Sequence, residues 1–468
     1  MKATAAKNWL GLALGALLLG GLLSLFLVSG RAPYLSRVFD DPQFVKRILV
    51  IHVNLTLEVW ILGFFGALFL SLPGARAGSK TLLLAGLGVV LFVASGFLPG
   101  AEPILSNYIP VLNHPLFFTG IALFYASVAL TLLDRRLLPV RQSPERSALP
   151  LPREAQLLLK TAGAIYLLGL VVFALAIAHT SREMAAPIYF EFIFWGGGHV
   201  FQFVNIAAML AVWVILLDEV MGAPVPGQPV AWLICAMLLL PALAAVALTA
   251  GGTQGAAYYP GFMLLMRWAT WPAIALLLIV AGRALFGAIG SGRLAPRRLY
   301  SAAFGGFFWS AVLILLGFAL GALIGQSTTL IPAHYHATIG SVTVAFMAAT
   351  YLLLERLGLA IPTPRLKRLA AWQPTIYGGG QLAFALGFAG AGLHGLERKA
   401  YGPEQAIRSV EQTIGLGVMG IGGMFAIAGG GLFLYIAART YFQRAWTMPP
   451  APPKSVNAHA APGTTEPR

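Results

Sequence analysis

The sequence predicts an all-α integral membrane protein, built as a bundle of twelve transmembrane helices with both termini on the cytoplasmic side. Three observations predict this fold: the composition, the length of the apolar runs and the distribution of basic residues. Of the 468 residues, 58% are hydrophobic and 10% are charged, and the mean hydropathy is +0.80. A soluble domain carries about 25% charged residues. The composition therefore excludes a soluble enzyme, a disordered protein and a disulfide scaffold.

Each predicted helix is a run of mostly apolar residues between polar breaks. A helix needs about 20 such residues to cross a bilayer. Runs of this kind lie at residues 9–30, 47–72, 81–99, 114–133, 157–179, 187–217, 230–251, 261–287, 300–325, 330–354, 374–396 and 413–438. The first run is too long for the apolar region of an ordinary signal peptide, so we interpret it as a helix. We expect 1–445 to form the membrane domain and 446–468, rich in Pro and Ala, to form a disordered cytoplasmic tail.

The basic residues between the runs orient the bundle. With the N-terminus in the cytoplasm, 22 of the 31 Lys and Arg residues fall on the cytoplasmic side and eight on the outer side, while Arg267 lies within a run. Cytoplasmic loops of membrane proteins carry this kind of excess. We therefore expect a multi-pass protein of the inner (cytoplasmic) membrane. Its net charge of +15 is a topology signal and does not indicate a nucleic-acid partner.

Seven of the eight histidines fall in the predicted outer half of the membrane. They are His52, His114, His179, His199, His334, His336 and His394. Imidazoles inside a bundle are costly unless they pair or bind a ligand, and imidazole is the common ligand of haem and transition metals. The layer favours a haem or metal protein over a secondary transporter, which twelve helices alone would also allow. The single cysteine, Cys235, excludes a CxxCH haem attachment and a thiolate metal site.

The pair His334 and His336 indicates more than one cofactor. Residues two apart on a helix point about 200° away from each other, so these two rings cannot share one metal. The helix would then lie between two cofactors, and His52 is the natural second ligand for a haem with two axial histidines. The alternative is a pair of polar residues at a helix start that bind their neighbours by hydrogen bonds.

At these residues the sequence resembles subunit I of the haem-copper oxidase superfamily, nearer to its nitric oxide reductase and cbb-type branches. The likeness extends over essentially all twelve runs. The run IHVNLTLEVWILGFFGA resembles the helix that supplies one ligand of the low-spin haem, and PAHYHATIGSVTVAFMAATY resembles the helix that binds both haems. The resemblance implies two haems of b type, with His52 and His336 on the low-spin haem and His334 on the high-spin haem.

The segment GLHGLERKAYG is similar to the family's G-x-P-R-R-Y stretch, whose basic pair neutralises haem propionates. By this resemblance the pair would be Arg398 and Lys399, with Glu397 in place of the family's proline. Arg267 is a further candidate for a propionate partner. Its alternative role is that of an arginine that reaches from the helix to the membrane surface.

The distal metal site departs from the family. There, one histidine and an adjacent histidine pair hold a second metal, Cu or Fe, opposite the high-spin haem. His199 in WGGGHVFQF matches the first, but Ala256 and Ala257 stand at the positions of the pair. Alanine binds no metal. One turn after His199, where family members carry Tyr or Glu, this chain has Phe203.

Two arrangements of this site remain open. Other side chains could replace the missing ligands, the candidates being Glu191, Tyr258, Tyr259, His179 and His114. Alternatively no second metal binds, and the high-spin haem faces a distal pocket in which His199 and Gln202 bind a diatomic gas by hydrogen bonds. Tyr258 and Tyr259 belong to this pocket in either case.

The acidic residues bear on proton supply. The inner half of the bundle has almost no ionisable residue, so we expect no proton pumping from the cytoplasm. Four glutamates, at positions 58, 102, 183 and 191, lie towards the outer side. Of these, Glu58 is the one expected to be deep.

The leading interpretation is a membrane dihaem oxidoreductase subunit of respiratory electron transport. It would pass electrons from the low-spin to the high-spin haem and reduce or bind O2 or NO, with an altered or missing second metal. Electrons would come from a separate subunit, a cytochrome c or quinol. An alternative keeps the fold without the reduction step, as an electron conduit, gas sensor or assembly partner. A haem-free transporter would leave the histidines and the motifs unexplained.

Overall fold

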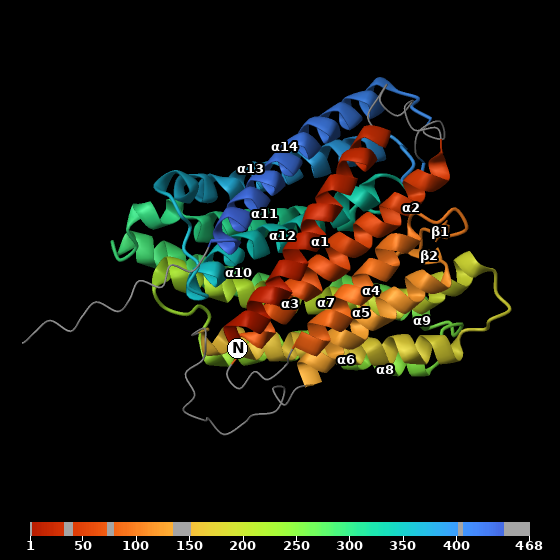
Figure 1. Cartoon of the computed structure of the whole chain (residues 1–468), viewed down its shortest axis with the longest axis horizontal. Coiled ribbons are helices and arrows are strands. Elements are labelled where there is room, and N and C mark those ends of the chain that lie inside the picture. The colour runs from red at the N-terminus through yellow and green to blue at the C-terminus, as the bar shows by residue number, and fades with distance from the viewer. Residues whose placement is uncertain (1, 32–40, 73–78, 134–150, 401–405, 444–468) are drawn as a thin grey trace, which may run out of the picture.

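The computed structural model describes residues 2–31, 41–72, 79–133, 151–400 and 406–443 (Figure 1). The elements in chain order are α1 (Lys2–Arg31), α2 (Pro42–Val53), the π-helical turn η2 (Asn54–Val59), α3 (Trp60–Leu70), α4 (Ser79–Ser95), β1 (Glu102–Ile104), β2 (Val111–Asn113), α5 (Pro115–Leu133), α6 (Arg153–His179), α7 (Ala186–Met221), α8 (Gln228–Ala250), α9 (Tyr258–Ala269), α10 (Trp271–Gly290), the 3-10 turn η3 (Pro296–Tyr300), α11 (Ala302–Ala322), α12 (Leu330–Arg356), α13 (Pro364–Leu393) and α14 (Val410–Tyr441). The expected tail from 446 onward lies outside the described residues.

A helix stands at each of the twelve predicted runs, but within the described ranges ten helical stretches are long and apolar enough to cross a membrane. The second stretch is continuous through α2, η2 and α3, and the seventh consists of α9 and α10, which meet at Thr270 just before Pro272. Two predicted runs are not among these ten stretches, each for a different reason. Helix α4 has 17 residues, whereas α13 is long but rich in glycine and carries Gln381. The protein is thus an integral, multi-pass helical bundle.

Polar contacts gather several chain segments at one end of the bundle, which we call the hairpin end after β1 and β2. The two strands pair antiparallel, with Pro103 opposite Leu112. In the loop between them, Asn107 donates from its backbone N–H to Glu191 at the start of α7, over 2.9 Å. Its side-chain carbonyl accepts a bond from Arg398, just after α13. The loop therefore ties together elements that are far apart in the sequence.

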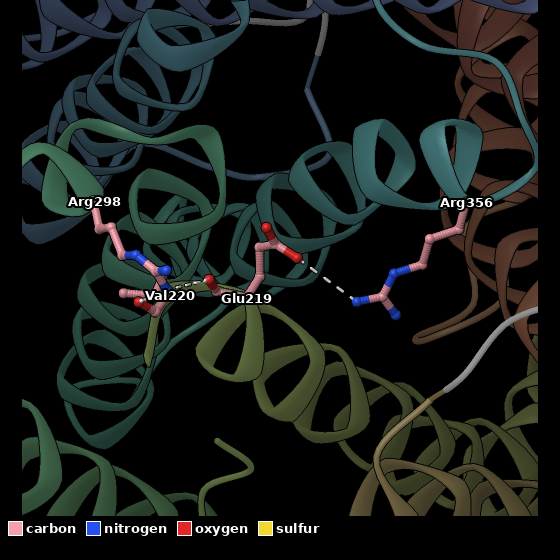
Figure 2. Close-up of polar contacts among 4 residues, drawn as sticks. All are labelled: Glu219, Val220, Arg298 and Arg356. Carbon is pink, nitrogen blue, oxygen red and sulfur yellow. Dashed lines mark hydrogen bonds and ion pairs between the residues drawn. The ribbon is translucent and has the colours of Figure 1, made fainter. Parts of the chain in front are cut away.

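The opposite end of the bundle is held around the end of α7. Figure 2 shows Arg298 reaching the backbone carbonyls of Glu219 and Val220, over 3.3 and 3.0 Å, and Arg356 at the end of α12 lying 3.7 Å from the Glu219 carboxylate. The last carbonyls of a helix have no partner within the helix. Arg298 satisfies two of them from η3 and so fixes where α7 ends.

Helix α7 forms the centre of the bundle. Of its most apolar window, 94% is buried inside the protein, against 28% for the stretch of α9 and α10. The residues of this window of α7, His199 among them, therefore lie in the interior of the bundle and not against lipid.

Helices α13 and α14 approach closely through glycines. A Cβ atom on Gly387 would lie 2.2 Å from the backbone nitrogen of Met419, and one on Gly422 would lie 2.3 Å from that of Phe384. Small residues permit such close contact between membrane helices. The contact places α13 against a neighbour along its length, which explains how a helix of modest apolarity belongs to the bundle.

Gly422→Leu is expected to lower the free energy of unfolding by about 1–3 kcal/mol or more, because the new side chain must displace the backbone of α13. Thermal unfolding of the detergent-solubilised protein measures the change. Gly420→Leu is the matched control on the same helix, since a Cβ at Gly420 meets no atom within 4 Å. Equal losses in the two variants would contradict the close contact.

Candidate functional site

His52 lies in the last turn of α2, with its Nδ1 atom 2.8 Å from the backbone carbonyl of Gly20 on α1. A carbonyl oxygen accepts hydrogen bonds and cannot donate them, so Nδ1 carries the ring proton. The lone pair is then on Nε2. This is the arrangement in which histidine binds a metal, with the second ring nitrogen oriented by a hydrogen bond.

His334 has the same arrangement near the start of α12. Its Nδ1 lies 2.6 Å from the carbonyl of Gly317 on α11. A Cβ atom on Gly321, one turn further along α11, would lie 2.9 Å from the His334 ring. The glycine therefore provides the room in which the imidazole lies. The Nε2 lone pair of His334 and the space that Gly321 leaves for its ring fit an axial haem ligand.

His336 faces another helix. Its ring centroid lies 4.6 Å from that of Phe384 and 6.2 Å from that of Phe388, both on α13. The rings of His334 and His336 thus face α11 and α13 respectively, as the two-residue spacing predicts. The two phenylalanines give His336 an apolar wall of the kind that a haem face requires.

His199 is buried in α7, and hydrogen bonds engage both of its ring nitrogens. Nδ1 lies 2.6 Å from the carbonyl of Trp195, and Nε2 lies 2.8 Å from the hydroxyl of Tyr108. Because Nδ1 donates to the carbonyl, Nε2 of the neutral ring is the acceptor and the hydroxyl donates. The rings of Tyr108, Trp195 and Phe262 surround the imidazole at centroid distances of 4.1, 4.7 and 5.3 Å.

Tyr108 is not among the site residues expected from the sequence. It lies in the loop between β1 and β2, with a left-handed φ of 67°. Burial, and then the negative charge of Glu191, raises the pKa of its phenol, so the hydroxyl keeps the proton that it donates to His199. The available signal was the run of three glycines before His199.

These three glycines give aromatic rings direct access to the backbone of α7. A Cβ on Gly198 would lie 2.5 Å from the Cβ of Tyr108, and one on Gly197 would lie 2.2 Å from the Phe173 ring. A Cβ on Gly196 would lie 2.8 Å from the Tyr258 hydroxyl. Side chains larger than hydrogen would therefore displace these rings from the helix that carries His199.

The residues expected to surround a second metal do not form a metal site. Ala256 and Ala257 are exposed in the turn before α9. The Tyr258 hydroxyl donates to the carbonyl of Phe192 and accepts from the N–H of Gly196. The Tyr259 ring packs against Trp195 at 4.6 Å.

The other candidate ligands already have hydrogen-bond partners or lie apart from one another. Glu191 binds Asn107, and the Nδ1 atom of His114 accepts the N–H of Leu116 at the start of α5. Among the described residues, no three His, Cys, Asp or Glu side chains form a group that could hold a metal ion. Gln202 is half-buried on α7, whereas Phe203 is fully buried. The donor set therefore does not fit a second metal.

Arg398 and Lys399 lie at the hairpin end. Lys399 lines a pocket of about 650 Å³ together with Lys46, Glu102, Glu191 and Tyr259. Burial, and then the charge of Arg398, lowers the pKa of Lys399. Both side chains thus lie in a partly buried, polar region. Arg267, in contrast, is exposed on α9 beside the exposed Trp268.

Comparisons with known proteins identify the family. The family described as cytochrome c and quinol oxidase polypeptide I matches residues 4–426. An uncharacterised protein of Rickettsia prowazekii is 24% identical, over 93% of this chain and 96% of its own length. An uncharacterised protein of Aquifex aeolicus is 27% identical, over 75% of this chain and 84% of its own. The fold is similar to that of a haem-copper terminal oxidase dimer determined by cryo-electron microscopy, with a TM-score of 0.76, 16% identity, and 95% and 84% of the two chains covered.

Tyr108→Phe is expected to lower the free energy of unfolding by about 1–3 kcal/mol, because it leaves the buried Nε2 of His199 without a donor. Thermal unfolding measures the loss. Tyr189→Phe removes a hydroxyl on α7 for which no hydrogen bond is observed, and it is expected to change stability little. If the two variants lose equal stability, the Tyr108 hydroxyl does not pair with His199.

Proposed function

Since the chain belongs to the cytochrome c and quinol oxidase polypeptide I family, the subunit I family of the haem-copper oxidases, we propose that it is a dihaem membrane oxidoreductase subunit without a second metal. The observation that carries this proposal is a difference among the histidines. His52 and His334 have Nδ1 bound to a carbonyl and no described hydrogen bond on Nε2. His199 has both nitrogens occupied.

In this proposal His52 and His336 hold a low-spin haem between them. The carbonyl of Gly20 fixes the tautomer and the direction of the His52 ring, and the rings of Phe384 and Phe388 exclude water beside His336. His334 holds the high-spin haem from α12. A bound haem supplies an iron that exchanges one electron and, where one axial side is open, binds a diatomic gas.

The hairpin end supplies positive charge for the propionates of the two haems. Arg398 is the better placed of the two predicted side chains, because its bond to Asn107 holds the guanidinium in a defined position. Lys399 adds a second positive charge beside it. Arg267 is left out of this assignment since it is exposed on α9.

The distal side of the high-spin haem is proposed to be a hydrogen-bonding pocket. Gln202 on α7 is its polar group for a gas, because the Trp195 carbonyl and the Tyr108 hydroxyl already engage both ring nitrogens of His199 beside it. Tyr258 and Tyr259 form its wall, because their hydroxyl and ring contacts lock them against α7. A pocket of this kind orients a small gas such as O2 or NO. The electron donor is a separate subunit, a cytochrome c or a quinol.

A second candidate function is a haem protein that binds a gas or conducts electrons without reducing the gas. The aromatic packing around His199 favours it, since three rings lie within 5.3 Å of the imidazole and its Nε2 already has a donor. Consumption of O2 or NO by the reduced protein supports the first candidate. Reversible binding of the gas without consumption supports the second.

The haem and metal content of the purified protein tests the proposal directly. A pyridine haemochrome assay is expected to give two haems per chain, and metal analysis is expected to give no copper or iron beyond them. A stoichiometric additional metal would show that a distal site has been rebuilt. Absence of haem would exclude both candidate functions.

Substitution of single histidines assigns the ligands. His336→Ala is expected to abolish the low-spin spectrum, and His334→Ala to remove the high-spin haem, because neither axial bond has a substitute nearby. His394→Ala is the matched control. This residue also bonds a carbonyl through Nδ1, that of Gly390, but it is exposed after α13. An intact low-spin spectrum in His336→Ala would overturn the ligand assignment.

A further inference from the structure

The turn η2 carries a buried carboxylic acid that the proposed function does not use. Glu58 is 4% exposed. Its Oε2 accepts a hydrogen bond of 3.0 Å from the hydroxyl of Tyr125 on α5. Tyr166 on α6 donates in turn to the backbone carbonyl of Tyr125, over 2.9 Å. A carboxyl thus lies inside the membrane domain in contact with a neutral phenol.

No cation balances this carboxyl in the described part of the chain. The titratable groups that interact with it are the phenols of Tyr125 and Tyr166. An unpaired charge in an apolar interior is costly, and the group takes up a proton instead. Glu58 is therefore suited to carry a proton and not a permanent charge.

Asn54, four residues earlier in the same turn, provides an independent observation. Its side-chain nitrogen donates to the carbonyls of Val50 and Pro110, both over 2.9 Å. Because both partners only accept hydrogen bonds, the nitrogen must face them, and the amide orientation is fixed. The oxygen Oδ1 then points elsewhere, is buried, and has no partner. A buried acceptor of this kind is commonly satisfied by an internal water.

The geometry of η2 connects these two groups. Residues four apart lie on one side of a helical turn, so Asn54 and Glu58 are neighbours on η2. Pro110, which Asn54 binds, belongs to the loop between β1 and β2. Polar groups therefore extend from the hairpin end through Asn54 to Glu58. A π-helical turn inside an α-helix is frequently found at functional sites.

We propose that Asn54 and Glu58 hold an internal water between them, and that Glu58 is a proton-binding site inside the membrane that is loaded from the hairpin end. Its role rests on the proposed function. Glu58 lies six residues beyond His52 in one continuous helical stretch. A haem held by His52 would gain one negative charge on reduction, and this charge would strengthen proton binding by the Glu58 carboxyl, which takes its proton from water at the hairpin end.

Infrared spectroscopy of the full-length protein in H2O and in D2O tests the proton site without reference to haem. The protonated carboxyl is expected to give a C=O band that shifts on deuteration and is lost in Glu58→Gln. Glu154→Gln is the matched control, since Glu154 is also buried, at 7% exposure, but starts α6 at the opposite end. A band that persists in Glu58→Gln, or no band at all, would overturn the proposal.

Two further variants test the partners of Glu58. Tyr125→Phe is expected to shift the frequency of the band, because it removes the phenol that donates to the carboxyl, and it serves if Glu58→Gln does not fold. Asn54→Val is expected to slow the exchange of the band in D2O, because it removes the acceptor that holds the water. An unchanged frequency in the first variant, or an unchanged rate in the second, would contradict the arrangement.

Redox titration tests the coupling to haem. The midpoint potential of the low-spin haem is expected to fall with rising pH in the natural protein and in Glu154→Gln, and to lose this dependence in Glu58→Gln. The same dependence in all three would overturn the coupling. If no haem binds, the proposed function fails, while the infrared result still decides whether Glu58 holds a proton.

Discussion

The hydrogen bond from an imidazole Nδ1 to a backbone carbonyl is the interaction on which the site depends. His52, His199 and His334 all make it, over 2.6–2.8 Å. In an apolar bundle a ring nitrogen without a hydrogen-bond partner is energetically costly. This bond therefore fixes the tautomer, and the role of each ring then depends on what its Nε2 atom binds. For His52 and His334 the carbonyl comes from another helix. The packing of the helices therefore also determines which histidines can act as ligands, and glycines such as Gly321 make room for the rings.

The distal side shows how a family site can change while the fold is kept. On the correspondence proposed above, the place of the family's metal is taken by an imidazole that a phenol closes and aromatic rings enclose. A metal held by three imidazoles needs their three lone pairs, and here one is occupied and two are replaced by Ala256 and Ala257. The space and the hydrogen-bonding capacity have both been filled by residues that bind no metal.

Much of the fold could be predicted because a bilayer imposes a simple requirement of length and apolarity. Each run found in the sequence became a helix, and the opposite directions of His334 and His336 followed from helix geometry alone. The η2 turn could not be predicted, because a π-helical turn has no signature in the apolar pattern of Asn54–Val59. Helix α13 belongs to the bundle because of its glycine contacts with α14, and the sequence of α13 alone does not reveal these contacts.

The candidate site was predicted less completely, and for a physical reason. The proposed haem ligands lie on helices, where spacing determines direction, whereas Tyr108 lies in a loop 91 residues before its partner. The glycines at 196–198 indicated a close approach to α7 without identifying what approaches. For Arg267 the sequence left two roles open, a propionate partner or an arginine that reaches the membrane surface, because a position inside an apolar run does not determine which way the side chain faces. The side chain is exposed on α9.

The origin of the Tyr108 hydroxyl in a loop has a consequence for the way in which His199 can change state. The other described contacts of the imidazole come from helices, those of Trp195 on α7 and Phe262 on α9. The loop residue, held at a left-handed φ of 67°, can withdraw by rotation of a few backbone bonds at the membrane surface, and such a conformation is itself disfavoured for a residue with a side chain. Closure of the Nε2 lone pair thus depends on one loop residue, whereas the position of the imidazole depends on the helices.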